Sequence, residues 1–345
     1  MQIFDKPEIK PPKLPRGVGL GFFDGVHRGH QELLRTLVHE SRRTGLQPAV
    51  YTFPRHPESV LRPAAPFVSY LCDLEDRLAL LAECGIAETH LQPFDATFAS
   101  ISAADFLNRV LGDHLQAELI VAGHDYRFGH GGAGNVILLK NWAKARGIRV
   151  IIIEQVRIGG DRVSSSRLRK LISQGEIDAA AMLLGRPYCL RGQVVPGRQL
   201  GRKLGFPTAN LPVPPDLACP AYGVYASRTR VAGRTYSSIT HVGLRPTVDQ
   251  QATLPLTETY LYDTDMQLYG KDIHIDFLQM IRPEIKFDSL LQLSRQVGED
   301  LETVRDWHRR NEQCHEKAVV NGIPLYILPT GRFAQAIAHF VFYVP

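Results

Sequence analysis

Residues 17–30 read GVGLGFFDGVHRGH, a small apolar strand that gives way to a helix through a glycine-rich turn. We expect the strand over 17–23, and apolar residues at helical spacing predict the helix over 31–44. The turn carries two histidines, His27 and His30, where the helix begins. A strand that leads into a helix in this way is the building unit of an α/β fold with a parallel sheet.

The first half of the chain repeats this alternation. Further strands are predicted at 48–53, 118–122 and 149–153, and further helices at 74–84, 103–111, 136–146, 165–173 and 177–184. Helices that alternate with strands in this way cover a parallel sheet on both faces. We therefore predict an N-terminal α/β domain over residues 1–185.

The pattern changes after residue 185. Short strands separated by turns are predicted at 188–195, 223–231, 235–242, 257–262 and 272–277, and a helix at 289–306. These features are typical of a small antiparallel β-barrel or sandwich with a terminal helix. We expect this second domain over residues 186–306, and residues 307–345 form an extension whose role the sequence does not give.

The composition is that of an ordinary globular protein. Of 345 residues, 44% are hydrophobic, and 40 basic against 35 acidic residues give a net charge of +5. This charge fits small anionic ligands and is too weak and scattered to indicate nucleic acid. The five cysteines form no C-x-x-C pair, which favours the reducing cytoplasm.

Neither a secretory nor a membrane segment is expected. Residues 1–16 are polar and rich in proline, without the apolar core of a signal peptide. No apolar run approaches the roughly 18 residues that span a bilayer. We therefore predict no membrane partner, and homo-oligomerisation stays open.

The two histidines are candidates for phosphate chemistry. A helix N-terminus presents unpaired N–H groups and the positive end of a dipole, and both attract phosphate. His27 and His30 could hydrogen-bond phosphate oxygens and stabilise charge as a P–O bond breaks. Gly29 between them allows close approach of the backbone. The alternative is a pair of ordinary surface histidines.

A second phosphate candidate is VSSSRLR at residues 163–169, where hydroxyls and two arginines begin a helix. Hydroxyls and backbone N–H groups can hold phosphates, and arginine binds phosphate through two hydrogen bonds. The alternative is an ordinary helix cap with a solvated basic face.

A competing motif indicates a different class of enzyme. Residues 129–134 fit G-x-G-x-x-G, and Glu154 follows 20 residues later, as in an NAD-binding fold. However, the preceding strand ends near Ala122, whereas this fingerprint requires glycines on the turn itself. The alternative of an NAD enzyme is therefore the weaker one.

The second domain has its own phosphate candidate. Gly197, Gly201 and Gly205 alternate with basic residues, including Lys203, in a loop that could wrap a polyphosphate. Thr208 and Asn210 follow in an extended segment and point to the same side. Their hydroxyl and amide oxygens are hard ligands suited to Mg²⁺.

Glu258 is a candidate general base in this domain. It lies in LTETYLYD at residues 256–263, whose alternation turns it toward one side of a strand. A carboxylate that faced the interior would be costly without a partner or a role. It could accept a proton from an alcohol that attacks a γ-phosphate. The alternative is a solvated carboxylate.

Taken in order, these segments resemble the prokaryotic bifunctional riboflavin kinase/FAD synthetase family. The similarity runs from about residue 16 to about residue 306. It includes GFFDGVHRGHQ, VAGHDYRFG, VSSSRLRKL, LLGRPY, GRQLGRKLGFPTANL, VGLRPTV, ETYLYDTD and RPEIKFDSL. The H-x-G-H part is similar to the signature of nucleotidylyltransferases, which transfer a nucleotidyl group from a triphosphate and release pyrophosphate.

For the first domain, the resemblance implies a Rossmann-like adenylyltransferase in which FMN attacks the α-phosphate of ATP to give FAD and pyrophosphate. His27 and His30 match the family's phosphate-handling pair. The implied nucleotide-binding residues are Gly21, Phe22, Asp24, Gly29, Asp125, Ser165, Ser166 and Arg169.

For the second domain, the resemblance implies a β-barrel riboflavin kinase in which ATP phosphorylates riboflavin to FMN. Thr208 and Asn210 match the family's PTAN pair for Mg²⁺, and Glu258 matches its catalytic base. The implied nucleotide-binding residues of the loop are Gly201, Lys203 and Gly205. The implied substrates are ATP, riboflavin and FMN.

Some positions depart from the family pattern. Arg55 interrupts a TFxPHP-like segment, and Tyr260 and Thr264 replace the more usual His and Phe near the acidic strand. An alternative function is therefore a flavin-binding or regulatory protein that retains only one of the two activities.

Overall fold

The computed structural model describes residues 1–5, 14–61, 68–197, 206–245, 254–311, 318–320 and 323–325. The chain divides into two compact units. One consists of Met1–Arg157 with Asp161–Ser165, and the other of Ile158–Gly160 with Ser166–Pro345. Each unit has its own sheet and its own hydrophobic core.

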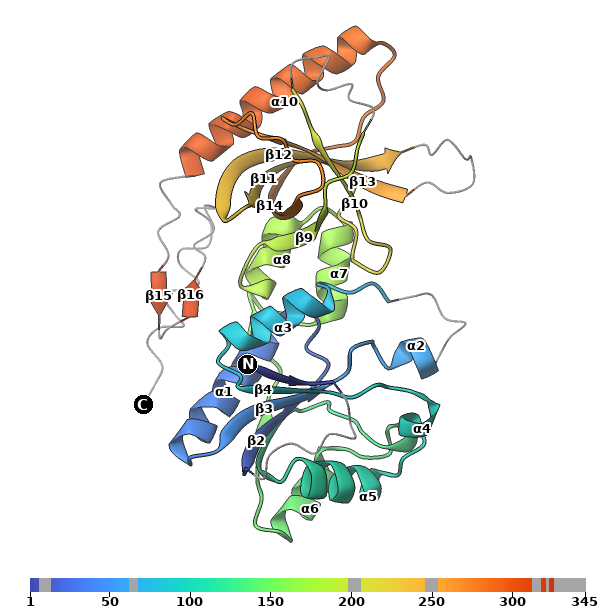
Figure 1. The fold of residues 1–345 in the computed structure, drawn as a ribbon, viewed down its shortest axis with the longest axis vertical. Helices are drawn as coiled ribbons and strands as arrows, with labels where there is room; N and C mark the ends of the chain where they lie inside the picture. The colour runs from blue at the N-terminus through green and yellow to red at the C-terminus, as the bar shows by residue number, and fades with distance from the viewer. Residues whose placement is uncertain are drawn as a thin grey trace. The chain divides into compact units, whose positions relative to one another are not determined.

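The first unit is built on six parallel strands in the order β1-β4-β3-β2-β5-β6 (Figure 1). They are β1 (Gln2–Phe4), β2 (Arg16–Leu20), β3 (Gln47–Thr52), β4 (Glu88–Leu91), β5 (Ala117–Gly123) and β6 (Arg149–Ile153). The predicted parallel sheet is confirmed. The sequence did not predict β1 and β4, because β1 is very short and β4 contains buried polar residues where an apolar run would be expected.

Helices cover both faces of this sheet. They are α1 (Arg28–Arg43), α2 (Glu58–Leu61), α3 (Leu74–Glu83), α4 (Ala96–Ala99), α5 (Ala103–Asp105), the π-helix η2 (Phe106–His114), α6 (Val136–Lys144) and the 3-10 turns η1 (Asp24–Val26) and η3 (His130–Gly132). Leu34 of α1 and Leu81 of α3 pack on one face, and Leu111 of η2 and Leu139 of α6 on the other. The helix predicted at 103–111 is present as α5 followed by η2.

Two glycines of β2 bring α1 close to the sheet. A Cβ at Gly19 would lie 2.9 Å from Cδ2 of Leu37, and one at Gly17 would lie 2.1 Å from Oγ of Ser41. Helix α1 therefore packs on bare backbone. This packing helps to hold its N-terminus just after the end of β2.

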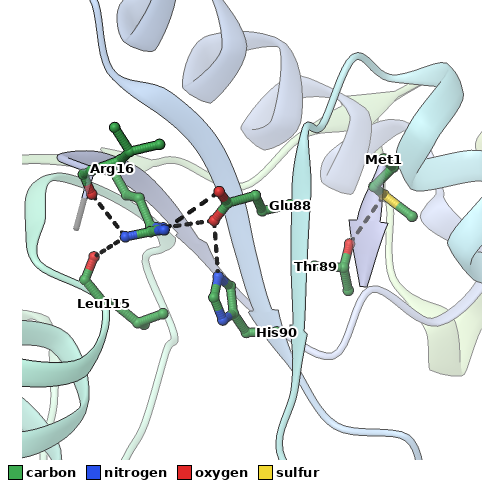
Figure 2. Close-up of polar contacts among 7 residues, drawn as sticks. Met1, Arg16, Glu88, Thr89, His90 and Leu115 are labelled. Atoms are coloured by element: carbon green, nitrogen blue, oxygen red, sulfur yellow. Dashed lines mark hydrogen bonds and ion pairs between the residues drawn. The ribbon is translucent and has the colours of Figure 1, made fainter. Parts of the chain in front are cut away.

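A buried ion pair ties the amino ends of β2 and β4 together (Figure 2). Arg16 Nε lies 2.6 Å from Oε2 of Glu88, and both side chains are buried. The same carboxylate oxygen lies 3.2 Å from Nε2 of His90, whose ring stacks on Phe4 of β1 with centroids 4.6 Å apart. Arg16 also donates to the carbonyl oxygens of Leu14 and Leu115. The charged groups therefore satisfy one another inside the fold.

The second unit contains six antiparallel strands in the order β10-β13-β12-β11-β14-β9. They are β9 (Tyr188–Gln193), β10 (Ala209–Pro212), β11 (Gly223–Val231), β12 (Arg234–Arg245), β13 (Leu254–Leu261) and β14 (Asp272–Pro283). A bridge between Val195 and Asn210 joins the two edges, so the sheet is a nearly closed barrel. The predicted barrel, rather than the alternative of a sandwich, is confirmed.

Among the described residues, three helices accompany the barrel: α7 (Ser165–Ser173), α8 (Ile177–Leu184) and α10 (Leu290–Asn311). Helix α8 packs against β14 and β9, and α10 lies across β11 and β12 (Figure 1). The short pairs β7 (Arg157–Ile158) with β8 (Asp161–Arg162), and β15 (Ala318–Val320) with β16 (Ile323–Leu325), complete the described elements. The predicted terminal helix is present and continues to Asn311.

The two faces of the barrel wall differ in chemistry. Inside, five fully buried hydroxyls hydrogen-bond one another at 2.8–2.9 Å. They belong to Ser227, Thr229, Ser238, Thr240 and Thr259. Outside, Ile239, Tyr260 and Tyr262 pack against Val304 and Trp307 of α10. Alternation along β13 therefore turns Thr259 inward and Glu258 outward.

Candidate active sites

The strand order of the first unit brings two distant segments to one edge of the sheet. β2 lies between β3 and β5, so the order reverses direction along the chain at the β2–β5 boundary. In open α/β sheets, ligands bind beyond the carboxyl ends of the strands at such a switch point. Residues 21–27 follow β2 and residues 124–128 follow β5, so both segments flank the expected ligand site.

The turn after β2 is held by unusual backbone angles and one buried carboxylate. Phe23 has φ 59° and Gly25 has φ 70°. A Cβ at Gly25 would also lie 2.7 Å from Cβ of Leu71. Asp24 is buried, and its Oδ1 accepts a hydrogen bond of 2.8 Å from the backbone N–H of Leu71. Asp24 therefore stabilises the turn, a role that its motif position alone did not reveal.

His27 and His30 lie together at the start of α1. His27 caps the helix, and its Nδ1 accepts a hydrogen bond of 3.3 Å from the backbone N–H of His30. The two rings are stacked, with centroids 3.6 Å apart and planes 11° from parallel. A Cβ at Gly29 would lie 3.2 Å from the His27 ring. The absence of a side chain at Gly29 therefore leaves room for the ring.

His30 is held in a neutral state. Burial lowers its pKa well below the ordinary 6.5, and the charges of His27 and Arg77 lower it further. Its Nδ1 is buried without a hydrogen-bond partner among the described residues. A neutral imidazole can donate one hydrogen bond and accept another, which suits a group that meets an incoming phosphate.

Arg77 of α3 contacts this turn, which no sequence pattern predicted. Its guanidinium donates to the carbonyl oxygens of Phe22, Phe53 and Pro54 and lies over the Phe22 ring, 4.5 Å from the centroid. The Phe22 carbonyl also accepts a hydrogen bond from Thr52 Oγ1. No motif marked Arg77, because its partners are backbone atoms of two other segments.

The remaining predicted residues of this site are placed as follows. Gly21 follows β2, and a Cβ there would meet the Phe23 ring at 3.1 Å. Asp125 follows β5 and pairs with Arg162 at 2.9 Å. Ser165 Oγ donates to the backbone oxygen of Asp24 at 3.4 Å. Ser166 and Arg169 lie on α7 and belong to the second compact unit.

The glycines of the NAD-type motif form a closed turn. Phe128 and Gly134 exchange two backbone hydrogen bonds, of 3.2 and 2.8 Å. A Cβ at Gly134 would lie 2.4 Å from the Phe128 ring, so this glycine is required for packing. Strand β5 ends at Gly123, several residues before the motif. The geometry is therefore not that of a dinucleotide fingerprint.

In the second unit, Thr208 precedes β10 and Asn210 lies within it. Asn210 is buried, and its Nδ2 donates to the Thr208 carbonyl at 3.4 Å. Gly197 lies against this amide, because a Cβ there would be 2.3 Å from Nδ2. The predicted loop residues Gly201, Lys203 and Gly205 lie outside the described residues.

Glu258 is the register partner of both Asn210 on β10 and His241 on β12. The three side chains therefore form a row on the outer face of the barrel. Glu258 is exposed, and its charge acts to raise the pKa of His241, although burial lowers that pKa overall. His241 also lies 3.7 Å from Glu284, so an imidazole stands between two carboxylates.

A cavity of about 290 Å³ opens beside Thr208. It is lined by Val194, Pro207, Thr208, Ala209, Leu261, Thr264, Asp265, Met266, Gln267, Leu268 and Tyr269. Thr264, one of the positions that departs from the family pattern, accepts a hydrogen bond from the backbone N–H of Met266. The cavity is therefore bounded by the start of β10 and the loop that follows β13.

A histidine turn at the switch point of a parallel sheet, joined to a barrel with a hydroxyl, an amide and a carboxylate, defines a two-domain nucleotide-dependent transferase. The family model of FAD synthetase matches residues 12–167, and that of riboflavin kinase matches residues 184–308. The chain belongs to the bifunctional riboflavin kinase/FMN adenylyltransferase family. It phosphorylates riboflavin to FMN with ATP and adenylylates FMN to FAD with release of pyrophosphate.

Individual relatives agree with this assignment. A bifunctional riboflavin kinase/FMN adenylyltransferase from Listeria monocytogenes is 36% identical over 295 residues, which cover 86% of this chain and 93% of the relative. The protein of that name from Escherichia coli K12 is 36% identical over 290 residues, covering 84% and 91%.

A solved structure is also similar over most of the chain. A Streptococcus pneumoniae structure described as a macrolide-efflux protein has a TM-score of 0.80 and 32% identity, and the match covers 88% of this chain and 98% of that one. In the described part of this chain, no helix has the length and apolarity needed to cross a membrane.

The matches decide between the alternatives considered from the sequence. Both family models are present, which favours the bifunctional enzyme over a flavin-binding or regulatory protein with one activity. The Rossmann-like and barrel architectures are those expected for the two activities.

Proposed function

We propose that the turn with His27 and His30 handles the phosphates of ATP during adenylylation of FMN. The supporting observation is that two stacked imidazoles, one of which caps the helix, lie at the start of α1 at the switch point of the sheet. The N–H groups of a helix start and of imidazoles can stabilise charge on the α-phosphate as the FMN phosphate attacks and pyrophosphate leaves.

The surrounding residues shape the nucleotide site. We assign nucleotide contacts to Gly21, Phe22, Gly29, Asp125, Ser165, Ser166 and Arg169. Asp24 contributes by fixing the turn through the Leu71 N–H. Asp125 is paired with Arg162 at the surface, so ATP would compete with this ion pair.

In the barrel, we propose that Glu258 is the general base for riboflavin phosphorylation. Its carboxylate is exposed on the outer face, beside Asn210 in the strand register. A carboxylate in that position can accept the proton of the ribityl hydroxyl as this oxygen attacks the γ-phosphate. The loop residues Gly201, Lys203 and Gly205 are proposed to contact the triphosphate.

Thr208 and Asn210 are proposed to hold Mg²⁺. The donor set fits this ion, because it consists of a hydroxyl and an amide oxygen next to a carboxylate. Asn210 uses Nδ2 toward the Thr208 carbonyl, which orients its oxygen away from that contact. When bound, Mg²⁺ neutralises charge on the β- and γ-phosphates.

We further propose the setting in which the enzyme works. Its net charge of +5 suits the anionic substrates ATP and FMN, and we propose neither a nucleic-acid nor a membrane partner. The five cysteines form no C-x-x-C pair, which supports a reducing cytoplasm. Homo-oligomerisation is tested by light scattering of the purified chain. The two functional domains are proposed to cover residues 1–185 and 186–306, with 307–345 as an extension.

Two reciprocal variants test the proposed residues. The full chain is incubated with riboflavin or with FMN, together with ATP and Mg²⁺, and flavins are separated by chromatography. Glu258→Ala should abolish FMN formation from riboflavin and leave conversion of supplied FMN to FAD intact. His30→Ala should do the reverse. The assignment fails if either variant retains the step that it is expected to lose.

A further inference from the structure

Arg77 stands behind the histidine turn without belonging to any motif. We propose that Arg77 is a positioning residue for adenylyl transfer, which fixes the turn to the ends of β2 and β3 and places a permanent positive charge beside Phe22 at the start of the turn. This inference rests on the phosphate-handling role proposed for His30. The inference adds to the site a residue of α3, a helix that follows β3 in the chain.

The first argument is geometric. Arg77 Nη1 donates to the Phe22 carbonyl at 3.0 Å, and Nη2 donates to the carbonyls of Phe53 and Pro54 at 2.8 and 3.1 Å. Phe22 follows β2, and Phe53 and Pro54 follow β3. One planar guanidinium therefore clamps the carboxyl ends of two neighbouring strands. A lysine could not reproduce this fork, because its ammonium is a point donor.

The second argument concerns the ring of Phe22. The guanidinium carbon of Arg77 lies 4.5 Å from the centroid of this ring. The ring centroids of His56 and Tyr70 lie 4.8 and 5.9 Å from the same centroid. Phe22 is thus held through both its backbone and its side chain. Because Phe22 begins the turn that ends at His27, its position determines where the imidazoles lie.

The third argument is electrostatic. Arg77 is 3% exposed, and no carboxylate of the described residues forms an ion pair with it. All its hydrogen-bond acceptors are backbone carbonyls. Cys72, Asp24 and Tyr70 are the titratable groups that act on its charge. A buried cation without a direct counter-ion is costly, so a purely structural role would be served better by an apolar side chain.

The charge of Arg77 acts on His30 of the turn. Burial, His27 and Arg77 all lower the pKa of His30, in that order. The rings of His27 and Phe23 therefore contact His30, and the Arg77 guanidinium acts on it through its charge. The positive charge of Arg77 favours the neutral imidazole before ATP arrives, and it also attracts the anionic phosphates.

Two variants separate the geometric from the electrostatic contribution. Arg77→Lys keeps the charge and loses the fork, whereas Arg77→Met loses both and keeps an unbranched side chain. Each full-length variant is assayed for FAD formation from supplied FMN and for FMN formation from riboflavin. His30 is titrated by NMR in ATP-free protein with labelled histidine, and its signal is assigned with His30→Asn.

We expect both variants to lower kcat for FAD formation by on the order of 10²-fold, because small displacements of reacting groups have effects of this size. FMN formation by the barrel should be unchanged. The pKa of His30 should rise in Arg77→Met and stay low in Arg77→Lys. Circular dichroism of each variant reports whether the α/β domain is folded, and a purely structural role would not separate the two titrations.

The proposal is overturned if Arg77→Met keeps wild-type FAD formation and wild-type titration of His30. It is also overturned if Arg77→Met unfolds the α/β domain while Arg77→Lys is fully active, because a positive charge that only stabilises the fold would then explain both results. The result for His30→Ala shows whether the role of Arg77 alone has failed or whether the proposed role of His30 has failed as well. If His30→Ala forms FAD normally, the role of His30 itself is wrong, whatever the Arg77 variants do.

Discussion

Asn210 on β10 and Glu258 on β13 are register partners in the barrel wall, although they are far apart in the chain. Residues directly opposite on antiparallel strands have Cβ atoms about 4.5–5.5 Å apart. A buried amide and an exposed carboxylate thus stand side by side on the outer face. This pair places a proposed metal ligand next to the proposed base.

We predict that Asn210→Ala lowers kcat/KM of riboflavin phosphorylation by on the order of 10²-fold, because the metal loses one ligand and positioning is lost. The Mg²⁺ concentration needed for half-maximal rate should increase. Initial rates of FMN formation over a Mg²⁺ series measure both effects. Gln193→Ala, which removes an exposed amide from β9, is the matched control. Wild-type Mg²⁺ dependence in Asn210→Ala would rule out the metal-binding role.

Gly29→Ala tests the space reserved for the His27 ring. Alanine favours a helix by ~1 kcal/mol over glycine, so the variant should not destabilise α1. However, its Cβ would lie 3.2 Å from the ring and displace it. We expect FAD formation to fall about 10- to 100-fold, with FMN formation unchanged.

The control for this variant is Gly112→Ala in η2, where the new Cβ would meet its nearest atoms at 3.6–3.7 Å, an ordinary contact. Steady-state rates and thermal unfolding are measured for both variants. Equal effects of the two substitutions on FAD formation would contradict a specific role for the Gly29–His27 contact.

Glu88→Gln tests the buried ion pair at the amino ends of β2 and β4. Burial acts to raise the pKa of Glu88, but hydrogen bonds from His90 and Arg16 outweigh this effect and lower it. Loss of the charge leaves Arg16 buried without its counter-ion, which should reduce the free energy of unfolding by about 3–5 kcal/mol.

Urea unfolding of the α/β domain measures the effect of Glu88→Gln. The control is Glu32→Gln, which removes an exposed pair with Arg35 and should cost at most ~0.5 kcal/mol. Because the folded pKa of Glu88 is lowered, its contribution is present above the unfolded pKa and is lost on acidification. A loss as small as that of Glu32→Gln would show that the buried pair contributes no net stability.

His30 should make the stability of the α/β domain depend on pH. Its folded pKa lies well below 6.5, so the unfolded chain binds the proton first as the pH falls. The unfolded state then holds more protons, and the free energy of unfolding decreases below about pH 6.5 until the folded pKa is passed. His30→Asn should flatten this part of the profile.

The profile is recorded by urea unfolding between neutral and mildly acidic pH. His39→Asn, which removes an exposed histidine from the same helix, is the control and should leave the slope unchanged. A slope that is identical in His30→Asn and in the unmodified chain would refute the prediction.

Much of this architecture could be predicted from the sequence. The spacing of apolar residues along the chain predicted the parallel sheet and the barrel. The helices at 165–173 and 177–184 have the predicted bounds. The strand β4 was missed because Glu88, Thr89 and His90 are polar. Their burial depends on contacts with other segments of the chain. The side chains of Thr208 and Asn210 were expected to point to the same side of the chain. The nucleotide-binding role of Gly201, Lys203 and Gly205 stays a prediction.

By itself, the sequence determined the two domain types, the histidine turn and the family, because these depend on local patterns and ordered motifs. Only the tertiary structure decided that Asn210, Glu258 and His241 form one row, since hydrogen-bond register joins strands that are distant in the chain. It also decided that Asp24 binds the Leu71 N–H and that Arg77 clamps two strand ends. The physical reason is that burial and hydrogen-bond partners are set by contacts between segments, which no local pattern records.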